Sequence, residues 1–184
     1  MTFQKDVKAD IAWGIPGEIA LAGAVRAEPF QLKTVFNGGA NVPTPYGRAV
    51  LRTDNVDAGS ATAPAHYQLG TIGGATGTFI GLLHAPKSDV AFAYVGSEAP
   101  GLEAGVMLEA ISETAGINVL LTTAANVGDA IAYKADGTLV AAPKQVAPAS
   151  STLIPGSRVV RFDVNAGLAI VALQQLPVPA AVTP

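Results

Sequence analysis

The sequence predicts an all-β protein: a single β-sandwich or a small β-barrel, built from short strands and hairpins, with extended N- and C-terminal arms. Its 184 residues are 49% hydrophobic and only 14% charged, and most of the apolar residues are small. The 20 glycines and 13 prolines divide the chain into short runs, whereas a helical bundle needs long periodic segments. Several of these runs alternate between apolar and polar residues, as strands do. We therefore expect less than about 15% helix.

The segment before Pro16-Gly17 has no convincing strand pattern. It places five apolar residues at uneven spacing among charged ones, and we interpret it as an extended arm that contacts a partner. An ordinary N-terminal strand within the sheet is the alternative, and the pattern favours neither. Single large aromatic residues often dominate binding interfaces, so Trp13 is the expected main anchor. The candidate partner-binding residues are Phe3, Val7, Ile11, Trp13 and Ile15.

The expected domain organisation has three parts. Residues 1–15 form the arm, residues 16–176 form one β core, and residues 177–184 form a tail. Three prolines keep that tail extended. The core contains no fixed repeat and no linker that would divide it.

In the first half of the core, glycine- and proline-rich segments separate the expected strands. A tight turn is expected at residues 22–24, loops at 37–45 and 54–64, and a glycine turn at 73–77. The expected strands are residues 18–21, 25–30, 30–36, 49–53, 67–70, 78–84 and 90–94.

In the second half, two hairpins carry the clearest signals. Asp136-Gly137 lies between apolar runs at 129–134 and 139–140, and Asp-Gly is a strong hairpin signal because glycine adopts positive φ easily. The second hairpin joins residues 158–164 and 168–176. Two further strands are expected at 107–112 and 117–123, separated by Ala115-Gly116. Any helix is expected to be a short turn within residues 101–108.

Composition excludes several classes of protein. The net charge of −3 and the pI of about 5.2 do not suit a nucleic-acid-binding surface. The chain has no cysteine, so it has no disulfide, thiolate zinc site or cysteine nucleophile. Its first ten residues alternate charges where a signal peptide would have an apolar core. The longest uncharged stretches are broken by Gly, Pro, Gln or Asn, so we expect no membrane span.

The low charge indicates a subunit of an assembly. A free monomer normally carries more surface charge for solubility, whereas charged residues are depleted at the centre of protein interfaces. A plain extracellular β-domain with a weakly charged surface is the alternative.

The sequence contains no recognisable catalytic motif and no metal-binding motif. The glycines at 70, 73, 74 and 77 do not match a nucleotide-binding loop and precede a strand. The segment 54–59 resembles a calcium loop but lacks the required ligands at its third and twelfth positions. His66 and His84 have no metal-ligand spacing, and the pair Glu109 and Glu113 has no second catalytic signal beside it. We therefore predict a non-enzyme with no metal, no cofactor and no stability change upon chelation.

Four stretches resemble, in order, the structural cement or capsid decoration proteins of tailed bacteriophages. The resemblance runs from about residue 3 to 174, and the segment 36–64 does not take part in it. The stretches that carry it are Gly17-Glu18 with Arg26-Ala27, residues 73–87, residues 122–133 with the turn at 136–139, and residues 167–171.

The resemblance implies a non-enzymatic, β-rich virion protein on the capsid exterior, assembled in the host cytoplasm. Its implied partner is the major capsid protein, whose neighbouring subunits it would bridge as a homo-oligomer on the capsid surface. No role with nucleic acid or membrane is implied. A β-sandwich module of a virion that binds carbohydrate or another surface is the alternative function.

Overall fold

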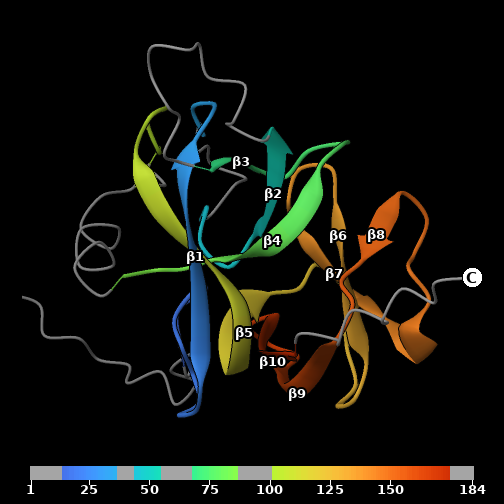
Figure 1. Ribbon diagram of the computed structural model, residues 1–184. Helices are drawn as coiled ribbons and strands as arrows, with labels where there is room; N and C mark the ends of the chain where they lie inside the picture. Colours follow the sequence, from blue (N-terminus) through green and yellow to red (C-terminus); the bar gives the residue numbers. More distant parts are fainter. Residues whose placement is uncertain (1–13, 37–43, 55–67, 87–100, 175–184) are drawn as a thin grey trace, which may run out of the picture.

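The computed structural model describes residues 14–36, 44–54, 68–86 and 101–174 (Figure 1). These residues form ten strands and one three-residue 3₁₀ turn, η2 (Pro143–Gln145), and the described ranges contain no α-helix. The predicted all-β class is confirmed.

Five strands close into a small barrel (Figure 1). Each strand pairs with the next in the order below, and β1 also pairs with β5, which closes the ring. All of these pairings are antiparallel except the short one between β1 and β3. The barrel order is β1 (Val25–Leu32), β3 (Leu69–Ile72), β2 (Ala49–Asp54), β4 (Thr78–Leu83) and β5 (Met107–Leu120).

Strand β5 is long enough to serve two parts of the molecule. Its first half pairs with β1 in the barrel, and its second half pairs with β10 (Leu168–Leu173), which in turn pairs with β9 (Ser157–Asp163). The predicted break at Ala115-Gly116 is wrong, because the strand runs through it. A Cβ on Gly116 would lie 2.7 Å from Ile170 Cγ2, so this glycine permits close packing between strands.

A second sheet packs on the extension formed by β5, β10 and β9. Its order is β7 (Leu139–Ala142), β6 (Ala130–Lys134) and β8 (Ser151–Leu153). The hairpin β6–β7 and the hairpin β9–β10 confirm the two predicted hairpins, whereas β8 and η2 were not predicted. Side chains of the two layers share one core, which includes Ile131 and Tyr133 from one layer and Ile117, Val159 and Val171 from the other. The protein thus combines a barrel with a sandwich.

Other boundaries differ from the predictions. Residues 18–21 form an isolated bridge between Ile19 and Ile117 instead of a strand. The runs 25–30 and 30–36 are one strand that ends at Leu32, and the predicted strand 67–70 lies at Leu69–Ile72. No helical turn lies within 101–108, where Leu102 pairs with Phe36 and β5 begins at Met107. The predicted strand 90–94 lies outside the described residues.

The β6–β7 turn joins the second sheet to the barrel. Its backbone contacts both the β3–β4 loop and the start of β2: the Gly74 N–H donates to the Ala135 carbonyl at 2.7 Å, and the Ala49 N–H donates to the Gly137 carbonyl at 3.0 Å. Gly137 has φ +80°, and a Cβ there would lie 3.0 Å from the Gly73 nitrogen.

We expect Gly137→Val to lower the free energy of unfolding by about 1–2 kcal/mol or more, because a β-branched residue is strained at positive φ. Thermal unfolding followed by circular dichroism measures the change. Gly137→Asn is the matched control, since Asn tolerates this conformation better, and it should cost less. Equal melting temperatures for the wild type and the Val variant would contradict the assigned turn.

Candidate partner-binding surfaces

The segment where the predicted arm meets the core forms backbone hydrogen bonds with β5. The Gly17 N–H donates to the Asn118 carbonyl at 2.7 Å, and the Asn118 N–H donates to the Glu18 carbonyl at 2.9 Å. The Ala20 N–H donates to the Gly116 carbonyl at 2.8 Å, and Ile19 bridges to Ile117 between these bonds. This paired segment, residues 14–21, is hereafter the anchor segment.

Two glycines let the anchor segment lie close to the body. Gly17 has φ +86°, and a Cβ there would lie 2.8 Å from the Leu83 carbonyl oxygen. A Cβ on Gly14 would overlap the side chain of the buried Asn118. The Gly17 carbonyl also accepts from the Ala85 N–H at 2.9 Å. The anchor segment is therefore fastened on both sides, to β5 and to the end of β4.

Of the five predicted partner-binding residues, only Ile15 lies in the described part of the chain. It is half-buried within the anchor segment, where its carbonyl accepts from the Glu18 N–H at 3.1 Å. Phe3, Val7, Ile11 and Trp13 lie outside the described residues. Their role as partner-binding residues stays a prediction.

A groove of about 790 Å³ separates the barrel from the second sheet. Its barrel side carries Arg26, Arg52 and Phe79, and its other side carries Tyr133 and Leu153. The Phe79 and Tyr133 rings stack with centroids 6.0 Å apart and planes 18° apart, so they tie the two sides together. Local sequence patterns carried no signal for this groove, because its residues come from six strands that are distant in sequence: β1, β2, β4, β5, β6 and β8.

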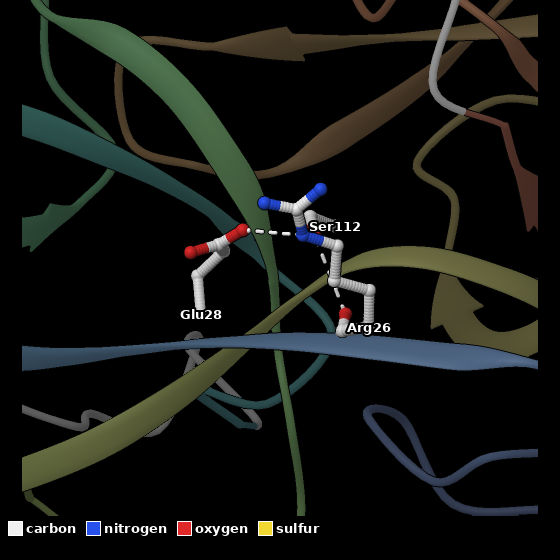
Figure 2. A network of polar contacts seen from close by, with 3 residues as sticks. All are labelled: Arg26, Glu28 and Ser112. Carbon is white, nitrogen blue, oxygen red and sulfur yellow. Dashed lines mark hydrogen bonds and ion pairs between the residues drawn. The ribbon is translucent and has the colours of Figure 1, made fainter.

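A small polar network lies on the barrel side of the groove (Figure 2). Arg26 Nε lies 2.8 Å from Glu28 Oε1, and the Ser112 hydroxyl donates to the Arg26 carbonyl at 3.3 Å. Arg26 and Glu28 are two residues apart on β1, so their side chains share one face of the strand. Exposed pairs of this kind contribute roughly 0–1 kcal/mol, and the pair leaves little net charge at this point of the rim.

A second polar network stabilises the β6–β7 turn. Asp136 Oδ1 accepts from the Thr138 N–H at 2.9 Å and from the Thr138 hydroxyl at 2.6 Å, while Arg48 Nη1 donates to the Asp136 carbonyl at 3.1 Å. Partial burial raises the pKa of Asp136, but the Thr138 hydrogen bonds and the Arg48 charge outweigh it and hold that pKa below its ordinary value. Burial lowers the pKa of Arg48, and Asp136 opposes that shift.

The lowered pKa of Asp136 predicts a small loss of stability in acid. A carboxylate with a lowered folded-state pKa stabilises the fold above its unfolded pKa, about 3.9, and loses that contribution as the pH falls through the folded value. The contribution should stay below about 1 kcal/mol, because the group is largely exposed to solvent. Melting temperatures of wild type and Asp136→Asn should differ most near neutral pH and converge below about pH 4. A constant difference across that range would contradict the assignment.

Three exposed apolar residues, Val35, Val106 and Met107, belong to the end of β1 or to the segments next to it. Met107 pairs in register with Gln31, and the Val106 carbonyl accepts from the Leu32 N–H at 2.9 Å, so both lie beside the end of β1. Val35 lies in the segment that follows the end of β1. Met107 and Val35 keep 46% and 51% of their surface exposed. Three scattered residues of this size suit a contact surface but do not define one.

Among the described residues, neither a cluster of metal-ligand side chains nor a membrane-spanning helix is found. Within the four described ranges, no three His, Asp or Glu side chains gather as metal ligands. His84 Nδ1 lies 3.3 Å from Glu109 Oε2, and His66 lies outside the described residues. The part of the chain with assigned structure contains no helix long and apolar enough to span a bilayer.

Comparisons with known proteins indicate a structural role. A family profile described as "Structural cement protein (E217 gp24/Pam3 gp6)" matches residues 3–174. One solved relative, a chain from the capsid of Myoviridae phage XM1, aligns with 95% of this chain and 99% of its own, at 16% identity and a TM-score of 0.59. At that identity the likeness concerns the fold. No curated protein matches the chain significantly.

Proposed function

The chain belongs to the phage structural cement protein family, a family of capsid-associated structural proteins, and on that premise we propose that it binds the outer surface of an assembled capsid and bridges neighbouring major capsid subunits. The anchor segment is the observation that carries this proposal. It ties the junction between the arm and the core to β5 through four backbone hydrogen bonds. An arm that holds a neighbouring subunit needs such a fixed base.

The chemistry of the arm supports the same role. Its apolar side chains gain free energy only against a surface that removes them from water, at about 25 cal/mol per Å². A neighbouring capsid subunit would supply that surface. Many such contacts, repeated around a closed shell, add up to strong attachment even when each is weak.

Further parts of the proposal follow from the same premise. The protein acts without catalysis, metal or cofactor, and it assembles onto the capsid in the host cytoplasm. It forms a homo-oligomer on the shell, where its low surface charge suits contacts between copies.

Reconstitution on capsids tests the proposal. Purified protein is added to heads that lack it, and occupancy is measured by gel densitometry and electron microscopy. Decorated heads should then withstand a higher temperature than bare heads before they release DNA. Heads that take up no protein, or that gain no heat resistance at full occupancy, would refute the proposed role. The same protein heated to unfolding before addition is the control for nonspecific adsorption.

A further inference from the structure

The last described residue, Gln174, lies where two grooves meet. One is the groove between barrel and second sheet, and the other is a smaller groove of about 300 Å³ that reaches β9 and β10. Gln174, Leu153 and Pro155 line both of them. The chain therefore leaves β10 at the junction of the two grooves.

The chain that follows Gln174 has a composition suited to that groove. Residues 175–184 read QLPVPAAVTP, with three prolines and no charged side chain. Proline-rich segments favour the polyproline II conformation, which leaves backbone carbonyls without internal hydrogen bonds. Grooves that bind such segments are lined by aromatic and apolar side chains.

The larger groove offers both kinds of contact. Phe79, Tyr133, Leu153 and Pro155 provide apolar surface. Arg52 is half-buried on the rim and, among the residues that the structure describes, has no side-chain hydrogen bond or ion pair. Its guanidinium can donate to the free carbonyls of an extended segment. Arg26 is already paired with Glu28, so the rim does not demand a charged ligand.

We propose that the groove between barrel and second sheet is a binding site for an uncharged, proline-rich extended segment, and that its occupant is residues 175–184 of the same chain. The attachment point favours the same chain over a second copy, because a short tether gives an effective concentration in the millimolar range. Bound there, the segment would contact both the barrel and the second sheet.

Disulfide trapping in the full-length protein tests this site, because the natural chain contains no cysteine. One cysteine replaces Val178, four residues past Gln174 and so within about 14 Å of it. The second replaces Thr152, an exposed residue of β8 that lines the larger groove. In the matched control, the second cysteine replaces Arg158 instead, an exposed residue of β9 that lines only the smaller groove. Oxidised glutathione is the oxidant, and melting temperatures verify that each variant folds.

We expect the Thr152→Cys/Val178→Cys protein to form an intramolecular disulfide at least about fivefold faster than the Arg158→Cys/Val178→Cys protein, at a rate independent of protein concentration. Equal rates in the two proteins, or no disulfide in either, would overturn the proposal. Crosslinked dimers that form faster at higher concentration would assign the groove to a second copy instead. The assay needs no capsid, so its outcome is separate from that of the proposed function.

Discussion

Deletion of residues 2–14 is expected to leave the core folded and to remove most of the protein's attachment to capsids. The deletion ends at Gly14, so it spares the backbone bonds that Gly17, Glu18 and Ala20 make with β5. It removes Phe3, Val7, Ile11 and Trp13, four of the five apolar side chains assigned to the partner. Ordering such a segment costs roughly 1–2 kcal/mol per residue, so we propose that it orders only against a neighbouring subunit.

Occupancy of undecorated heads by the truncated protein is the measurement, followed by a heat challenge. Trp13→Ala alone should weaken binding by about 2 kcal/mol or more per contact if Trp13 is the main anchor. Deletion of residues 177–184 is the matched control, because it removes a terminal segment with no assigned capsid contact, and it should keep full occupancy. Full occupancy and full heat resistance of the arm deletion would refute the arm's role. A truncated protein that cannot fold would show that the segment is a core strand.

Among substitutions that add a single methyl group to the described core, Gly73→Ala should lower the free energy of unfolding the most. Gly73 has φ +72°, and a Cβ there would lie 2.4 Å from the Gly137 nitrogen and 2.6 Å from the Ala135 oxygen. Both atoms belong to the backbone of the β6–β7 turn, which is itself bonded to Gly74 and Ala49. The turn cannot retreat without breaking those bonds, so we expect a loss of more than about 3 kcal/mol.

Urea unfolding followed by fluorescence and circular dichroism measures this loss. Gly128→Ala is the matched control: Gly128 also has positive φ, +95°, but no heavy atom lies within 4 Å of a Cβ built there. Gly128→Ala should lower the free energy of unfolding only by the cost of backbone strain, about 1 kcal/mol. Similar losses in the two variants would show that the β6–β7 turn does not press against Gly73. Insoluble Gly73→Ala protein beside soluble Gly128→Ala protein would agree with the expected difference.

Local signals predicted the hairpins well, and long-range contacts were not predictable from them. Asp136-Gly137 specified a turn because its own side chain and its positive φ fix the backbone. The residues at 115–116 gave a false turn signal, since the neighbours that make Gly116 necessary, Ile170 and Leu21, are distant in sequence. Strand β8 has only three residues and pairs with β6, too short a run for any periodicity to register.

The same distinction holds for the candidate surfaces. The scattered apolar residues before Pro16 indicated an arm, and the anchor segment lies where that arm was expected to end. The groove could not be foreseen, because Arg26, Arg52 and Tyr133 meet only once the barrel and the second sheet are assembled. Charge and composition predicted an assembly subunit without indicating where on the surface a partner binds.

Closure of the barrel by β5 has a consequence for synthesis on the ribosome. Strands β1, β2, β3 and β4 emerge first, but β1 finds its long antiparallel partner only in β5, which begins at Met107. Until then the nascent sheet has two open edges, and such edges can pair with other chains. Pairings across so many residues also form slowly. Translation pauses before residue 120, or crowding of ribosomes on one message, should therefore favour aggregation of nascent chains, and rapid passage through β5 should favour correct folding.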